Sequence, residues 1–169
     1  MGKDCASMPH APRDTSIRAA RGDDFEAVTA LLEKLGRAKV TDATREDCRA
    51  IFRQQVVDPN VHHMVAVNAE GEIVGFCSLH FRARLNHVAE EAWIPDLYVR
   101  ETARREGIGL AFLHEVERRA AARGCGAITL ESGYQRAEAH HLYRRFGMRD
   151  AGRYFTKHLE PDESPTARS

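Results

Sequence analysis

Apolar residues return every three or four positions along two stretches near the start of the chain, and this spacing predicts two helices. Asp23 can cap the first helix, and Gly36 ends it. Thr44 opens the second helix with Asp47 three residues on, which resembles a capping box, and Asp58-Pro59 stops it. The apolar faces predicted for the two helices consist of Phe25, Val28, Leu31, Leu32 and Leu35, and of Cys48, Ile51, Phe52 and Val56.

The same periodicity predicts two more helices in the second half of the chain. One begins at a pair of glycines near position 108 and continues to about Arg123, where Gly124 can end it. The other extends from about Arg136 to Phe146, with Gly147 as its C-cap. The apolar face of the first of these helices consists of Ile108, Phe112, Leu113, Val116 and Ala120.

Short runs of alternating or continuous apolar residues predict the strands, and turn residues separate them. The predicted strands cover residues 16–20, 61–67, 73–81, 90–99, 127–130 and 149–159. The turn Ala69-Glu70-Gly71-Glu72 makes the second and third of these a hairpin. The strand at 127–130 is predicted to be buried and parallel to the strand before it, because a helix connects the two and such crossovers are right-handed.

The alternation in the strand at 90–99 slips by one residue. Ala92 and Ile94 are in phase, yet the next apolar pair is Leu97 and Val99, on the other side of Pro95-Asp96. One extra residue that shifts the exposed face is the signature of a β-bulge, and proline is tolerated there because it cannot donate to the ladder. The alternative is a simple kink in an edge strand.

A turn rich in glycine and arginine follows this strand. Gly107 and Gly109 carry no Cβ, so their backbone can approach a ligand closely. The first turn of the next helix offers unpaired N–H groups and the positive end of the helix dipole. Arg100, Arg104 and Arg105 add guanidinium groups suited to phosphate oxygens. The turn therefore predicts a local phosphate site.

Two familiar glycine loops do not fit this turn. The spacing and the following residues exclude a P-loop. A dinucleotide fingerprint would have a third glycine where Phe112 stands, although Glu131 lies at the distance of the ribose-binding acid. Judged on the glycines alone, a tight structural turn with solvated arginines is the favoured interpretation, and the spacing to the preceding strand is what points to a ligand.

The length indicates one domain, and the balanced charge indicates that the protein has no strong overall electrostatic field. The 169 residues contain 25 Lys and Arg against 25 Asp and Glu, so neither nucleic acid nor an anionic membrane is an indicated partner. The domain is predicted over residues 15–159, between flexible tails at 1–14 and 160–169.

The remaining composition favours a cytoplasmic protein without a metal. The N-terminus lacks the apolar core of a signal peptide, and no apolar run is long enough to span a bilayer. The cysteines form no CxxC pair, which suits reduced thiols. The adjacent histidines His62-His63 and His140-His141 diverge on a strand or a helix, so neither pair makes a chelating site by itself.

Two motifs make the chain resemble the GNAT superfamily of acyl-CoA N-acyltransferases. Arg104-x-x-Gly107-x-Gly109, directly after the strand ending Leu97-x-Val99, is similar to the pyrophosphate-binding motif of that family. Ala139-x-x-x-Tyr143-x-x-x-Gly147-Met148 is similar to a second family segment, with Met148 in place of phenylalanine. The bulged strand and the order of elements agree with the family from about residue 17 to residue 159.

The resemblance implies an α/β fold with a mixed central sheet that is splayed at its parallel strands and flanked by helices. It also implies transfer of an acetyl group from acetyl-CoA to an amine by direct attack in a ternary complex. Leu97 and its neighbours on the bulged strand would offer backbone N–H groups to the thioester oxygen. The cofactor-binding residues that it implies are Leu97, Tyr98, Val99, Arg104, Arg105, Glu106, Gly107, Ile108, Gly109, Leu110, Arg136 and Tyr143.

Tyr143 stands at the general-acid position of the family, where its hydroxyl can donate a proton to the leaving sulfur. The alternative for Tyr143 is a helix tyrosine that packs against the sheet. Asp96 and Glu91 are the predicted catalytic carboxylates, as a base for the amine proton or as a holder of a cationic substrate. Glu90 and His80 are further candidates, and each carboxylate can equally be an exposed residue with no role.

Two positions depart from the family pattern. Arg136 stands where many members have an asparagine that contacts the cofactor, and Glu106 adds a negative charge to the phosphate turn.

The segment from Ser132 to His140 resembles enzymes that acetylate small molecules, and the linker 37–41 is predicted to face the substrate. The alternatives are a non-catalytic acyl-CoA-binding module and a peptide or protein N-acetyltransferase. A homodimer is possible in either class.

Overall fold

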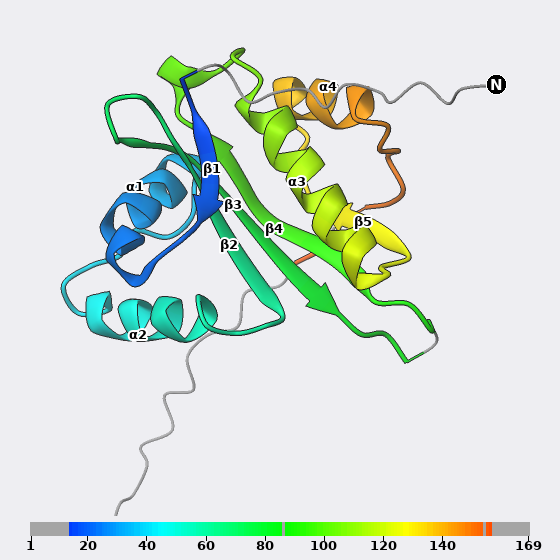
Figure 1. Ribbon diagram of the computed structural model, residues 1–169, viewed down its shortest axis with the longest axis horizontal. Helices are drawn as coiled ribbons and strands as arrows, with labels where there is room; N and C mark the ends of the chain where they lie inside the picture. The colour runs from blue at the N-terminus through cyan, green and yellow to red at the C-terminus, as the bar shows by residue number, and fades with distance from the viewer. Residues whose placement is uncertain (1–13, 86, 154, 157–169) are drawn as a thin grey trace, which may run out of the picture.

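The computed structural model describes residues 14–85, 87–153 and 155–156, which form a five-stranded sheet with helices on both faces (Figure 1). The strands are β1 (Ser16–Ala19), β2 (Val61–Val67), β3 (Ile73–Arg82), β4 (Glu91–Val99) and β5 (Ala127–Leu130). The helices are α1 (Phe25–Leu35), α2 (Arg45–Gln55), α3 (Ile108–Arg123) and α4 (Ala137–Arg145), with 3-10 turns at Gly22–Asp24 and Glu101–Ala103.

The strands lie in the order β1-β2-β3-β4-β5. Neighbours are antiparallel from β1 to β4, whereas β4 and β5 are parallel because α3 connects them. The predicted mixed α/β sheet is confirmed, and so is the parallel direction of β5. No helix in the described ranges is long and apolar enough to cross a membrane.

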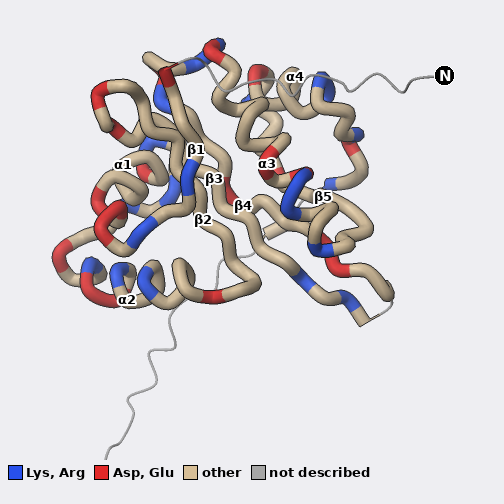
Figure 2. Tube along the Cα trace, in the orientation of Figure 1, with Lys and Arg blue, Asp and Glu red and all other residues tan. Residues whose placement is uncertain are grey.

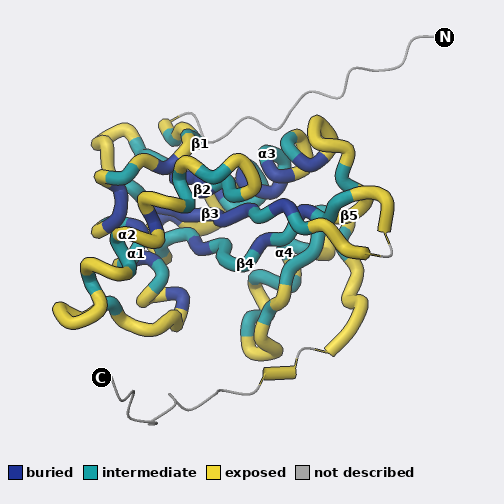
Figure 3. The backbone as a smooth tube through the Cα atoms, turned by 90° about the horizontal axis from the view of Figure 1, so that it is seen from below, coloured by how far each residue is buried: buried dark blue, intermediate teal, exposed yellow. Residues whose placement is uncertain are grey.

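Each face of the sheet carries its own hydrophobic core. On one face, Phe112 and Leu113 of α3 pack against β3 and β4, and α4 lies beside them. On the other face, Phe25 of α1 and Phe52 of α2 pack against Phe76 and Tyr98. Figure 3 shows the buried backbone concentrated in the sheet between these two layers. Charges of both signs are dispersed over the outside (Figure 2), in agreement with the balanced composition.

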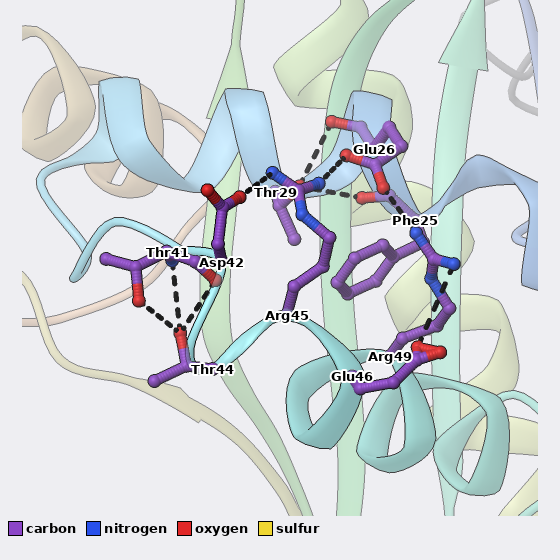
Figure 4. A network of polar contacts seen from close by, with 9 residues as sticks. All are labelled: Phe25, Glu26, Thr29, Thr41, Asp42, Thr44, Arg45, Glu46 and Arg49. Atoms are coloured by element: carbon purple, nitrogen blue, oxygen red, sulfur yellow. Dashed lines mark hydrogen bonds and ion pairs between the residues drawn. The ribbon is translucent and has the colours of Figure 1, made fainter.

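An ion-pair network fixes α2 against α1 (Figure 4). Glu26 of α1 accepts from Arg45 at 2.6 Å and from Arg49 at 2.7 Å. These hydrogen bonds lower the pKa of Glu26. Since both helices are anchored, the connecting segment 36–44 is held at each end, and Arg37 at its start is directed toward β4.

The C-terminal glycines Gly36 and Gly124 cap their helices as predicted, but the predicted N-terminal caps are wrong in detail. Asp24, not Asp23, accepts the backbone N–H of Arg21 at 2.7 Å, because the Arg18 guanidinium holds the Asp24 carboxylate in place. Thr44 stands at the N-cap of α2 but forms no capping bond. Its backbone is helical rather than extended, and its hydroxyl instead accepts the N–H of Thr41 at 3.1 Å.

Three other predictions need correction. Ile51 was expected on the buried face of α2, yet it is 55% exposed, because α2 turns Phe52 inward and docks through its arginines. The strand β5 is only half-buried, since it forms the edge of the sheet. The predicted closing strand does not form at 149–153 or 155–156, where exposed residues pair with no neighbouring strand; its other positions lie outside the described residues.

Candidate functional site

The bulge predicted in β4 is confirmed, and it opens the sheet. Ser78 pairs with Asp96 and His80 pairs with Trp93, so Leu79 faces two residues of β4 in place of one. The parallel pairing with β5 extends only from Glu91 to Ile94. From Pro95 onward, β4 therefore diverges from β5 within the described part of the chain. The gap between the two strands is a place where an extended ligand can find free backbone groups.

Buried polar atoms at the end of β5 fit this interpretation. The hydroxyls of Thr129 and Ser132 are buried and have no hydrogen-bond partner among the described residues. Unpaired buried hydroxyls are uncommon in proteins and call for an explanation. Both residues lie next to the point where β4 leaves β5, so a ligand between the strands would be close to them.

The glycine turn has the backbone geometry of an anion site. Arg105 and Gly107 both have positive φ, at 65° and 87°. For a residue other than glycine this conformation costs about 1 kcal/mol, so the turn holds Arg105 in mild strain. The first hydrogen bond at the start of α3 is donated by Ala111 to Gly107 at 2.9 Å. The N–H groups of the three residues between them precede that bond and can receive an anion.

The arginines of the turn are held by neighbouring groups. Arg104 donates to the carbonyl of Val99 at 3.2 Å and lies over the Tyr98 ring at 5.5 Å. Glu138 of α4 lies 3.8 Å from Arg104 and 3.4 Å from Arg105. Glu106 is exposed and lines a separate hollow beside the β2–β3 hairpin, so its charge is directed away from α4.

The second glycine of the turn allows α4 to approach α3. A Cβ at Gly109 would lie 2.9 Å from Leu142 Cδ2, closer than carbon atoms pack. The absence of that atom brings α4 close to the start of α3. Tyr143, the next residue of α4, packs against the core of β3 and β4 that includes Cys77 and Leu97.

The environment of Tyr143 keeps its hydroxyl protonated. Burial raises the pKa of Tyr143 to about 12, and the positive charge of Arg136 opposes that shift. Burial also raises the pKa of the neighbouring Cys77 thiol. Both groups are therefore neutral near pH 7, and the tyrosine hydroxyl has a proton that it can donate.

A polar row crosses the opposite face of the sheet at the bulge, formed by His63, Ser78, His80 and Asp96. His63, Ser78 and Asp96 are direct partners across β2, β3 and β4. His80 Nε2 lies 3.0 Å from the Ser78 hydroxyl, and the His63 and His80 rings are 6.0 Å apart. Asp96 faces Arg37 at 2.7 Å. The row places two titratable groups, His80 and Asp96, within reach of the gap.

The two histidines of the polar row are neutral near pH 7. Burial lowers the pKa of His63 to about 4, and the charge of His80 lowers it further. Burial also lowers the pKa of His80, against the opposing effect of Asp96. A neutral imidazole can accept a proton, whereas Asp96 already shares its charge with Arg37.

The structure does not bring the predicted Glu91 to the bulge. Glu91 begins β4, five residues before Asp96 and about 16 Å away at the usual rise of a strand. Its carboxylate pairs with Arg82 at 2.8 Å. Glu90 pairs with Arg123 at 2.6 Å. Asp96 and Leu97 therefore lie at the bulge, with Tyr143 on the Leu97 face of the sheet, and the other two carboxylates lie at the far end of the strand.

Arg136, which was predicted to bind the cofactor, contacts the end of α1. It precedes α4 and its guanidinium donates to the carbonyl of Leu35, at the end of α1. This contact was not predicted from the sequence, and neither were the positions of Ser78 and Trp93 near the bulge. A buried serine inside the apolar strand β3 was the available signal for Ser78. Trp93 lies against His80 and donates to Glu131 at 2.6 Å.

Comparison with known proteins agrees with this geometry. Residues 25–148 match the sequence model of the Acetyltransferase (GNAT) family. Aminoalkylphosphonate N-acetyltransferase of Salmonella typhimurium is 32% identical over 143 residues, which cover 85% of this chain and 90% of that protein. IAA acetyltransferase of Azospirillum brasilense is 28% identical over 127 residues, covering 75% and 80%.

Solved structures share the fold. A transcriptional regulator from Bacillus halodurans superposes with a TM-score of 0.78 at 27% identity, covering 86% of this chain and 99% of that one. Glucosamine-6-phosphate N-acetyltransferase from Arabidopsis thaliana gives a TM-score of 0.70 at 19% identity, with coverage of 86% and 99%. The splayed mixed sheet is therefore a fold that these proteins have in common.

Proposed function

The chain belongs to the GNAT family of acetyltransferases, and from this premise we propose that it moves the acetyl group of acetyl-CoA to a primary amine of a small molecule. Direct attack within a ternary complex is the proposed route. The Salmonella typhimurium relative is an aminoalkylphosphonate N-acetyltransferase. Its acceptor class supports a small amine over a peptide.

One observation carries the proposal: the gap at the bulge has near it both a turn suited to phosphate, at Gly107, and a protonated tyrosine, Tyr143. The N–H groups at the start of α3 suit the pyrophosphate of acetyl-CoA, with Arg104 beside them. The diverging part of β4 suits the extended pantetheine arm. Tyr143 packs against the same core as Leu97, which follows the bulge where the thioester would lie.

The proposed chemistry assigns one task to each group. The amine nitrogen attacks the thioester carbonyl, and backbone N–H groups near Leu97 stabilise the developing oxyanion. The carbon–sulfur bond then breaks as the Tyr143 hydroxyl donates its proton to the sulfur. Asp96 or His80, in the polar row, takes the proton that the amine loses.

Calorimetric titration with acetyl-CoA tests the binding half of this proposal. We expect one acetyl-CoA per chain and no heat from NAD. Arg104→Ala is expected to weaken binding about five- to tenfold, because one partly exposed guanidinium contact is lost. Arg118→Ala, on the outer surface of α3, is the matched control and leaves the affinity unchanged. An absence of heat with acetyl-CoA would contradict the proposal.

Glu138 is predicted to compete with acetyl-CoA for the arginines of the turn. Its carboxylate lies 3.4 Å from Arg105 and 3.8 Å from Arg104, where phosphate oxygens are proposed to bind. We therefore expect Glu138→Gln to tighten acetyl-CoA binding about two- to threefold, a modest effect because all three side chains are exposed. The same titration measures it. Weaker binding by the glutamine variant would mean that Glu138 positions the arginines instead.

A further inference from the structure

From the two arginines beside α1, we propose that the acceptor is an amine that also carries an acidic group. This inference rests on the proposed function, since it concerns the same acceptor site. The acidic group, a phosphonate or a carboxylate, is bound by Arg136 and Arg37, while the ammonium group is received by Asp96. The ligand class is therefore a small zwitterion.

Arg136 is a half-buried cation without an anionic partner. Its guanidinium donates to the carbonyl of Leu35, and its Nη2 lies 3.9 Å from the position of a Cβ on Gly36. Among the ion pairs of the described residues, Arg136 takes part in none. Its charge also reaches Tyr143, whose pKa it lowers against the effect of burial. An arginine that sits beside the proton donor and lacks a carboxylate is suited to an anion on the substrate.

Arg37 approaches the same place from the other side. It follows Gly36 directly, so it shares the end of α1 with the Arg136 guanidinium. Its Nε donates to Asp96 at 2.7 Å, and its Nη2 donates to the Pro95 carbonyl at 2.9 Å. Arg37 therefore lies at the bulge, and Arg136, from a distant part of the chain, binds the end of α1 two residues before Arg37.

The Arg37–Asp96 pair determines which acceptors fit. An amine must approach Asp96 or the polar row, and in doing so it opens this ion pair. A simple amine would satisfy Asp96 and leave Arg37 without a counter-charge. A zwitterion replaces both halves of the pair, because its ammonium group faces Asp96 and its acidic group faces Arg37 and Arg136. The exchange keeps every charge partnered.

A purely structural role for Arg136 is the competing explanation, since cations stabilise the C-terminal end of a helix such as α1. That role predicts an effect on folding and none on the choice of acceptor. Acceptor selectivity separates the two explanations. Arg136→Lys keeps the positive charge but loses the paired donors, and Arg136→Gln loses both.

The test compares 2-aminoethylphosphonate and β-alanine with ethanolamine, at saturating acetyl-CoA, by release of free CoA thiol. We expect kcat/KM to be at least about tenfold higher for the two acidic amines. Arg136→Gln and Arg37→Gln are each expected to reduce this preference about tenfold, the lower value of a charge-assisted contact. Arg136→Lys should restore part of it. Arg53→Gln, on the exposed side of α2, removes the same charge elsewhere and is the control.

Equal kcat/KM for acidic and uncharged amines would overturn the inference, and so would an Arg136→Gln variant whose preference is unchanged. Calorimetric titration of the CoA-bound protein with 2-aminoethylphosphonate and with ethanolamine measures the same preference as a ratio of affinities, without turnover. Failure of the proposed function has a different result, because the protein would then not bind acetyl-CoA.

Discussion

Replacing Tyr143 with phenylalanine is expected to lower kcat about a hundredfold while acetyl-CoA binds as before. Tyr143 packs against the same core as Leu97 of the bulged strand, and its pKa of about 12 keeps its hydroxyl protonated. General acids contribute about 10²–10⁴-fold, and a thiolate is a good leaving group, so the lower part of that range applies. Single-turnover thiol release and calorimetry together measure kcat and binding.

Tyr134→Phe is the matched control for this experiment. Tyr134 lies in the loop before α4 and is 80% exposed, so the loss of its hydroxyl should leave kcat within about twofold. The kcat of the Tyr143→Phe enzyme should also fall by the same factor at every pH below about 10, because the donor does not titrate there. A Tyr143→Phe variant with normal kcat would mean that this tyrosine only packs against the sheet.

The features of the site that could be predicted from sequence are those encoded by neighbouring residues. The bulge follows from the slip between Ile94 and Leu97, since both must face the same core while Pro95 cannot pair. The turn at Gly107 follows from a conformation that glycine adopts readily. Such signals do not depend on what lies across the fold.

The contacts that complete the site were not predictable in this way. Arg37 meets Asp96 across 59 residues, and Arg136 meets Leu35 across 101. A sequence pattern shows that an arginine is present but not which distant backbone it will approach. The closing strand does not form at 149–153 or 155–156 for a similar reason, since a strand forms only where a partner edge accepts its hydrogen bonds.

His63 of the polar row is buried, and its protonation would weaken the fold. His63 is 7% exposed, stacks on Phe52 at 5.5 Å and places Nε2 3.0 Å from the amide oxygen of Gln55. Its Nδ1 is buried without a partner among the described residues. A neutral ring is accommodated there, but a charged ring would add a cation next to His80 at a buried position.

The fold is therefore expected to lose stability in mild acid through His63. Its pKa is about 4 in the folded chain and near 6.5 in the unfolded chain, so between these values the unfolded state binds more protons. The free energy of unfolding then falls as the pH falls through this window. At about 1.4 kcal/mol per pKa unit the total is about 3 kcal/mol, of which about 2 kcal/mol is lost between about pH 7 and pH 4.5.

His63→Phe tests this origin, because a phenyl ring keeps the stack on Phe52 and cannot be protonated. We expect urea unfolding of the variant to depend less on pH than that of the natural chain, by about 2 kcal/mol over the same interval. His62 and His80 also have lowered pKa values and add to the loss in both proteins, so only the difference is informative. The paired carboxylates of Asp24 and Glu115 have lowered pKa values and weaken the fold only in stronger acid. If the variant loses as much stability as the natural chain, the acid sensitivity belongs to the other histidines, and His63 is tolerated in its charged form.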